Sequence, residues 1–289
     1  MNKALTGLLQ KFSIHPLFWV IIGISIITAH FKELLIVFCI VLIHELGHAS
    51  MALFFRFRIK KIQLLPFGGV VELDEHGNRP LKEELLVILA GPVQHIWMMG
   101  LGFFLHEMNL LSTTYYELFI YHNLVILLFN LLPIWPLDGG KLLFLLFSYY
   151  MSFSKAHRFT IITSIGLLIL FAGVSFTIEP LQLNLWVIFL FLVISLYHEW
   201  KQSNFVYVRF LLERYYGNNR KISRLKPILV KEADEIMDVL SKFYRGYKHH
   251  IVIMENNKKR FELDENELLH AYFAEKLTSS KMKDFIHEY

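Results

Sequence analysis

The stretch LLIVFCIVLIHELGH, residues 34–48, decides the fold of this chain. An unbroken apolar run ends directly at three polar side chains, those of His44, Glu45 and His48. A charged group in the middle of a membrane-spanning helix costs about 2.5–3.5 kcal/mol. Another interaction must offset that cost at Glu45, so the stretch predicts a membrane helix that carries a functional polar site.

The spacing of the two histidines indicates a metal site. Residues i and i+4 lie on the same face of a helix, so the imidazoles of His44 and His48 can reach one Zn²⁺. Glu45 follows the first histidine directly, where its carboxylate can take a proton from a metal-bound water. A structural hydrogen-bonded triad of the same three side chains is the alternative interpretation.

The composition extends the membrane prediction to most of the chain. Of the 289 residues, 55% are hydrophobic and 19% are charged, and the mean hydropathy is +0.43. Intrinsically disordered chains have low hydrophobicity, so this composition excludes a disordered protein. The single cysteine, Cys39, excludes a scaffold held by internal disulfides. From residue 199 onward the chain holds 17 of its 29 Lys and Arg. We therefore expect an apolar membrane part followed by a soluble C-terminal part.

Six apolar segments are candidate membrane spans, because a helix needs roughly 20 predominantly apolar residues to cross a bilayer. They cover residues 16–29, 34–54, 85–105, 117–150, 159–177 and 181–196. Lys and Arg follow the second and fourth segments, whereas the connections after the third and fifth contain none. Basic loops face the cytoplasm, so the alternation places both termini there. The predicted fold is a polytopic α-helical membrane protein with about six transmembrane helices.

The fourth apolar segment contains a candidate for a third metal ligand. A catalytic zinc site has three protein ligands and one open position. Asp138 lies in NLLPIWPLDGG, residues 130–140, where two prolines and two glycines are expected to interrupt the helix. Irregular backbone at membrane depth must be buried in protein or line a wet cavity. The interruption lets Asp138 turn toward His44 and His48; the alternative is an ordinary loop with Asp138 exposed.

These two motifs, in this order and both in apolar segments, resemble the site-2 protease family of intramembrane zinc metalloproteases. The resemblance covers roughly residues 1–197 and is greatest to the family members that act in endospore formation. It differs at one place, because many members have Asn where GPVQH, residues 91–95, has His95. His95 can donate a hydrogen bond as Asn would, or pack. The resemblance implies metal ligands at His44, His48 and Asp138, a general base at Glu45, and substrate positioning by Asn130 and Pro136.

The segment FGGVV, residues 67–71, predicts a short strand or hairpin between the second and third spans. In the family, such a segment can pair with an extended substrate, and strand addition would suit a substrate helix that must unwind before cleavage. The resemblance therefore implies substrate contacts at Phe67, Gly68, Gly69 and Val70. An ordinary cytoplasmic loop is the alternative.

The C-terminal third divides into a linker, residues 198–224, and a small domain, residues 225–289. Aromatic and basic residues alternate in the linker, which is typical of the membrane–water interface. The domain pattern is strand, helix, strand, strand, helix. This order resembles a cystathionine-β-synthase (CBS) domain, which implies a regulatory role and ATP as a ligand. One copy fits, and because such domains act in pairs, we expect a homo-oligomer; a purely structural domain is the alternative.

Together these features predict a zinc endopeptidase in residues 1–197 that cleaves a membrane-associated pro-protein near the cytoplasmic face. The resemblance implies a sporulation sigma factor precursor as substrate, inhibitory membrane proteins as further partners, and the membrane around the forespore as location. We expect contact with the lipid bilayer and no direct contact with nucleic acid. The competing class is a transporter or channel gated by the C-terminal domain. Transporters usually repeat their broken helices, and this chain has one.

Overall fold

The computed structural model describes residues 12–14, 22–23, 25–27, 31–65, 68–73, 77–178, 183–217, 224–255, 258–277 and 280–286. The chain is divided into two compact units. The first contains Met1–Glu75, Lys82–Leu142 and Leu167–Val193; the second contains His76–Leu81, Leu143–Gly166 and Ile194–Tyr289. Most of the predicted span at 16–29 lies outside the described residues.

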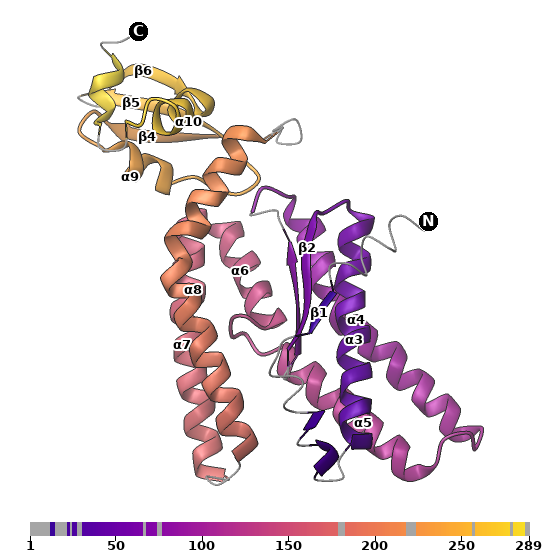
Figure 1. Ribbon diagram of the computed structural model, residues 1–289. Helices are drawn as coiled ribbons and strands as arrows, with labels where there is room; N and C mark the ends of the chain where they lie inside the picture. Colours follow the sequence, from indigo (N-terminus) through magenta and orange to yellow (C-terminus); the bar gives the residue numbers. More distant parts are fainter. Residues whose placement is uncertain are drawn as a thin grey trace. The chain divides into compact units, whose positions relative to one another are not determined.

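Three helices of the described part are long and apolar enough to cross a membrane. They are α3 (Phe31–Phe54), α4 (Leu81–Glu107) and α7, which runs from Phe153 to Ile178 and qualifies over Phe153–Thr177 (Figure 1). Large apolar side chains project outward from them: Ile96 is 64% exposed and Ile169 is 68% exposed. In water these surfaces would favour aggregation, whereas lipid solvates them. The structure thus agrees with a membrane protein for these three predicted spans.

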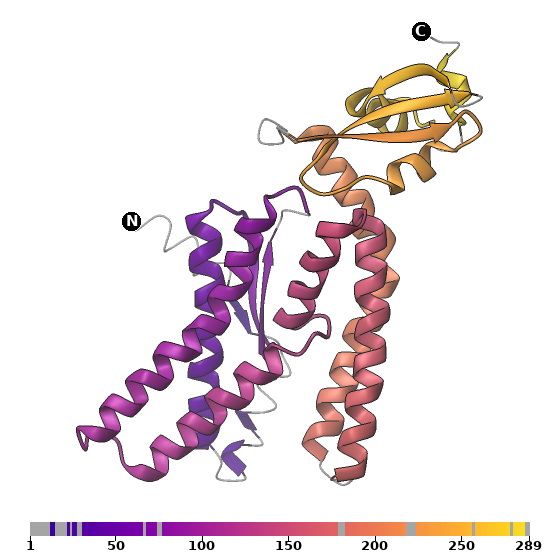
Figure 2. The ribbon, with the colours of Figure 1, turned by 180° about the vertical axis from the view of Figure 1, so that it is seen from behind.

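The predicted fourth segment consists of two helices separated by the proline-containing stretch 131–137. Helix α5 (Thr113–Asn130) ends before it, and α6 (Asp138–Tyr150) begins at the predicted ligand (Figure 2). A Cβ added to Gly139 would overlap the carbonyl groups of Leu131 and Leu132. Glycine therefore lets the end of α5 fold back against the first turn of α6. The predicted interruption is confirmed.

A small three-stranded sheet lies beside α3. Strand β1 (Phe12–Ile14) pairs parallel with β2 (Ile59–Leu65), and β2 pairs antiparallel with β3 (Gly68–Leu73). The predicted hairpin around residues 67–71 is confirmed, although Phe67 itself lies outside the described residues. Helix α3 packs against β2 and β3. Within the described residues β3 pairs on one side only, so its other edge can accept a further strand.

The second unit ends in the predicted order of strand, helix, strand, strand, helix. Strand β4 (Leu225–Lys231) runs parallel to β5 (Lys248–Glu255), which pairs antiparallel with β6 (Lys258–Asp264). Helix α9 (Ile236–Ser241) follows β4 and α10 (Glu265–Phe273) follows β6. A 3₁₀ helix, η2 (Met282–Ile286), comes last. The element order is therefore confirmed, whereas membership of the CBS family stays a prediction.

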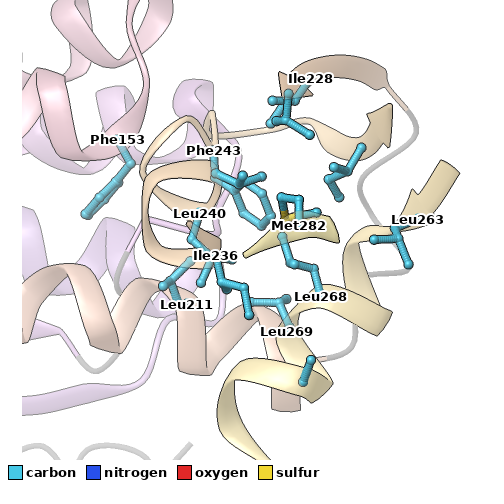
Figure 3. Close-up of a cluster of buried hydrophobic side chains, with 14 of the residues drawn as sticks. Phe153, Leu211, Ile228, Ile236, Leu240, Phe243, Leu263, Leu268, Leu269 and Met282 are labelled. Atoms are coloured by element: carbon cyan, nitrogen blue, oxygen red, sulfur yellow. The ribbon is translucent and has the colours of Figure 1, made fainter. Parts of the chain in front are cut away.

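Helix α8 (Leu183–Tyr216) contains the described part of the predicted sixth span, from Leu183, and most of the predicted linker. Its Phe210 and Leu211 are fully buried in the core of the second unit, in which Figure 3 labels Leu211. They pack there with Ile236, Leu240 and Phe243 from the C-terminal domain. The residues assigned to a linker are thus helical up to Tyr216 and part of a packed core.

A buried ion pair fixes the end of α8 to the C-terminal domain. Arg214 Nε donates to Glu265 Oε1 at 2.6 Å, and both side chains are 0% exposed. The backbone N–H and the ring of His249 also contact Glu265 Oε2. Burial alone would raise the pKa of Glu265, but the hydrogen bond from His249 and the charge of Arg214 outweigh it and lower the pKa to about 2. The carboxylate is therefore charged, and it joins α8, β5 and α10.

Candidate metal centre and active site

Three ligand atoms converge inside the first unit. His44 Nε2 lies 3.0 Å from His48 Nε2, and Asp138 Oδ2 lies 3.1 Å from the first and 3.0 Å from the second. The three residues are 2%, 5% and 2% exposed. Four ligands at Zn²⁺ distances of about 2.0–2.2 Å would be about 3.3 Å apart in a tetrahedron. The observed triangle is thus close to one face of a zinc coordination sphere.

His48 and Asp138 each make a further hydrogen bond through their other polar atom, and these bonds favour a cation between His48 Nε2 and Asp138 Oδ2. His48 Nδ1 donates to the carbonyl oxygen of Val87 at 2.8 Å, so in the neutral imidazole Nε2 carries a lone pair. Lys141 Nζ donates to Asp138 Oδ1 at 3.0 Å and leaves Oδ2 toward the histidines. Two acceptors, His48 Nε2 and Asp138 Oδ2, therefore face each other at 3.0 Å, which a shared metal ion would stabilise.

Glu45 lies beside this group and against the edge strand. Ligand atoms of His44, Glu45 and His48 lie within 4.8 Å of one another, and Glu45 is 4% exposed. A Cβ added to Gly69 in β3 would overlap the Glu45 side chain. The backbone of β3 can approach the carboxyl group this closely because residue 69 is glycine. The backbone of β3 therefore lies directly against the Glu45 side chain.

Gly91 in α4 leaves room for the rings of His44 and His48, as Gly69 does for the side chain of Glu45. A Cβ built on Gly91 would overlap the His48 ring and come within 2.8 Å of His44 Cε1. The contacts involve rings held by hydrogen bonds at their other nitrogens, so neither ring can move away freely. Glycine at residue 91 is thus required by close packing of α4 on α3.

We predict that Gly91→Ala lowers zinc affinity and cleavage by at least about 10-fold, because the added methyl group displaces the two imidazoles. The zinc content of the purified enzyme, measured after dialysis, checks this. Gly100→Ala in the same helix is the matched control, because nothing lies within 4 Å of a Cβ there. Equal zinc content in both variants would contradict the prediction.

The residues expected to position a substrate lie at the end of α5, in the stretch before α6 and in β3. Asn130 is the last residue of α5, and its Nδ2 donates to the carbonyl oxygen of Ile126. Pro136 lies in the stretch between α5 and α6, after a cis peptide bond. Gly68 and Val70 belong to β3 with Gly69, and Phe67 lies outside the described residues. Their roles toward a substrate stay predictions.

Three polar residues near the site were not among the predicted site residues. Lys141 holds Asp138, and His95 Nε2 contacts His44 Nδ1 at 3.1 Å. Asn123 Oδ1 contacts His95 Nδ1 at 3.0 Å. For His95, the structure selects hydrogen bonding over simple packing. Polar side chains in apolar segments are usually functional, and this signal could have identified all three.

A buried pair of histidines, a buried aspartate and an adjacent glutamate inside apolar helices define the class of membrane-embedded zinc metalloproteases. The sequence model described as peptidase family M50 matches residues 32–109 and 105–173. The chain belongs to peptidase family M50. The transporter or channel alternative is therefore set aside.

Individual relatives agree with this assignment. The chain is 51% identical over 289 residues to stage IV sporulation protein FB of Bacillus subtilis (strain 168), covering 100% of both proteins. It is 31% identical over 188 residues to a zinc metalloprotease of Methanocaldococcus jannaschii, covering 59% of this chain and 52% of that protein. The solved structure of the site-2 protease from Methanocaldococcus jannaschii aligns with a TM-score of 0.54 and 26% identity, over 65% of this chain and 89% of that one.

Proposed function

We propose that this membrane zinc metalloprotease cleaves a membrane-associated pro-protein near the cytoplasmic face, and that the substrate is the precursor of a sporulation sigma factor. The catalytic part of the proposal rests on the triangle of His44 Nε2, His48 Nε2 and Asp138 Oδ2, with Glu45 beside it. The substrate part rests on the full-length similarity to a sporulation protein.

His44, His48 and Asp138 would hold Zn²⁺, which lowers the pKa of a bound water to about 7 and polarises the substrate carbonyl group. Glu45 takes the proton of the attacking water and passes it to the leaving amine. Its position one residue after His44 keeps the carboxyl group close to the imidazole pair. Lys141 keeps Asp138 oriented through the other carboxylate oxygen.

The free edge of β3 is the proposed binding surface for the substrate. An extended peptide would pair with the backbone of β3, and Phe67, Gly68, Gly69 and Val70 would contact it. Asn130 and Pro136 would position the chain from the other motif. This arrangement is supported by the contact between Gly69 and Glu45, which brings the paired peptide next to the general base.

We further propose the six-span topology with both termini in the cytoplasm and, in a sporulating cell, location in the membrane around the forespore. The alternation of basic loops supports the orientation. The apolar first half of α8 and the apolar helix α5 would supply further spans beside α3, α4 and α7. Inhibitory membrane proteins would act on this assembly from the bilayer.

Co-expression with a candidate sigma factor precursor, followed by blotting for the shortened product, tests the substrate. The matched control is a precursor with prolines at alternate residues of the segment around the cleaved bond. Proline removes the N–H groups that strand pairing uses, so we expect cleavage to fall at least about 10-fold. No product from the unaltered precursor would reject this substrate, and equal cleavage of the proline form would reject pairing with β3.

The C-terminal domain is the proposed regulatory part, with ATP as its ligand and a homo-oligomer as its working state. The order of its strands and helices supports this assignment, as does its firm attachment to α8 through Phe210, Leu211 and the Arg214–Glu265 ion pair. Helix α8 continues without interruption from Leu183, in its apolar half, to Tyr216. A change in the domain can therefore act on α8 directly.

We predict that ATP binds the full-length enzyme and changes cleavage roughly 5–150-fold, the range of about 1–3 kcal/mol of allosteric coupling. A ligand changes activity only if it binds one arrangement more tightly, so binding and cleavage must respond over the same ATP concentrations. Equilibrium binding and cleavage assays on the purified enzyme check this, with GTP at the same concentrations as the control. Absence of ATP binding at millimolar concentration would contradict the prediction.

A further inference from the structure

Three helices are connected by a chain of buried hydrogen bonds that ends at His44. In α5, Asn123 Nδ2 donates to the carbonyl oxygen of Phe119 at 3.0 Å. Asn123 Oδ1 lies 3.0 Å from Nδ1 of His95 in α4, and His95 Nε2 lies 3.1 Å from Nδ1 of His44 in α3. Asn123 and His95 are 0% exposed and His44 is 2% exposed. All three side chains are therefore shielded from bulk water.

The carbonyl group of Phe119, at the far end of this chain from His44, determines the donor and acceptor in each hydrogen bond. The Phe119 carbonyl oxygen can only accept, so the amide group of Asn123 must turn its Nδ2 toward it. Asn123 Oδ1 then faces His95 and can also only accept, so His95 Nδ1 carries the hydrogen. In the neutral ring His95 Nε2 is an acceptor, so His44 Nδ1 donates to it. His44 Nε2 is left with a lone pair.

This outcome matters because a competing arrangement exists. His44 Nε2 lies 3.1 Å from Asp138 Oδ2, so the other tautomer of His44 could donate a hydrogen bond to this carboxylate. That hydrogen would occupy the lone pair that a metal needs. In His48 the hydrogen is held at Nδ1, which donates to the Val87 carbonyl oxygen. At Nδ1 of His44, the side chain of His95 takes the place of such a carbonyl group.

The position of Asn123 supports a specific role for this contact. All of α5 lies in the described part of the chain, and Asn123 is its one fully buried residue. An apolar residue would pack there without the cost of burying an amide group. The amide group makes two hydrogen bonds, one with its own helix and one with His95.

We propose that Asn123 and His95 are positioning residues that hold His44 in the tautomer with a free Nε2 and thereby prepare the site for zinc. The proposal rests on the proposed role of His44 as a metal ligand. Neither residue touches the substrate; both act through His44. Partners of this kind typically change metal affinity or activity 10–100-fold when removed.

The test compares zinc affinity in full-length variants by competition with a chelator, together with kcat and KM for a model substrate. Asn123→Leu and His95→Phe keep approximate size and remove the hydrogen bonds. We expect zinc affinity to fall about 10–100-fold and kcat to fall with little change in KM, and added zinc to restore part of the activity. His95→Gln is the rescue variant, because its amide oxygen can accept from His44 and its amide nitrogen can donate to Asn123.

His122→Phe is the matched control. This neighbouring histidine is half-buried, and its Nε2 has no hydrogen-bond partner among the described residues. We expect wild-type zinc affinity from it, and more zinc retained by His95→Gln than by His95→Phe. Wild-type affinity in both Asn123→Leu and His95→Phe would overturn the proposal; if one does not fold, the other decides. Zinc retained by His44→Ala would instead reject the ligand set itself.

Discussion

Replacing Glu45 with Gln is expected to abolish cleavage while zinc stays bound. Gln has nearly the same shape and keeps the apolar packing beside Gly69, but its amide group cannot accept the proton of the attacking water. Loss of a general base typically costs about 10²–10⁴ in rate. His44, His48 and Asp138 are unchanged, so zinc content should equal that of the wild type.

Single-turnover cleavage and the zinc content of the same preparation check this prediction. Glu107→Gln is the matched control, because Glu107 is an exposed residue at the end of α4. We expect the control to cleave at the wild-type rate. Turnover by Glu45→Gln within about 10-fold of wild type would remove Glu45 from the mechanism.

Replacing Asp138 with Asn is expected to reduce both zinc retention and cleavage, the latter by at least about 100-fold. Asn has a neutral oxygen and loses the charge that balances a divalent cation. It also leaves the charge of Lys141 without its partner at 3.0 Å, which adds a cost that is unrelated to zinc. Zinc per molecule and cleavage rate are the measurements.

A second substitution separates these two effects. The double variant Asp138→Asn with Lys141→Met removes the unpaired ammonium group but still lacks the anionic ligand. If Asp138 is a ligand, the double variant regains stability in thermal unfolding but not zinc. Recovery of full zinc content in either variant would mean that the third ligand has been misassigned.

Local sequence features predicted the main parts of the site because they act over a few residues. The i and i+4 spacing brings His44 and His48 to one helix face in any helix that contains them. The prolines and glycines around Asp138 interrupt a helix wherever they occur. The glycine pair flanked by aromatic and β-branched residues at 67–71 indicates a strand in the same way. The element order of the C-terminal domain was predicted on similar grounds.

The remaining features arise from contacts between segments far apart in the sequence. Phe210 and Leu211 read as interface residues at the end of a span, and only packing places them in the core of the C-terminal domain. The extension of α8 to Tyr216 is stabilised by that burial and by the Arg214–Glu265 ion pair. Alternating aromatic and basic residues do not distinguish a position at the membrane interface from burial in a protein core.

For the site itself, the sequence by itself determined which side chains can bind a metal, and the tertiary structure decided how they are held. His95 is 51 residues from His44, and Asn123 is 28 residues further on, so no local pattern relates them. Glycine at residue 91 is explained by two rings on another helix, and glycine at residue 69 by a carboxyl group. Helix spacing is a property of one segment, whereas hydrogen-bond direction and close approach depend on the side chains that neighbouring segments present.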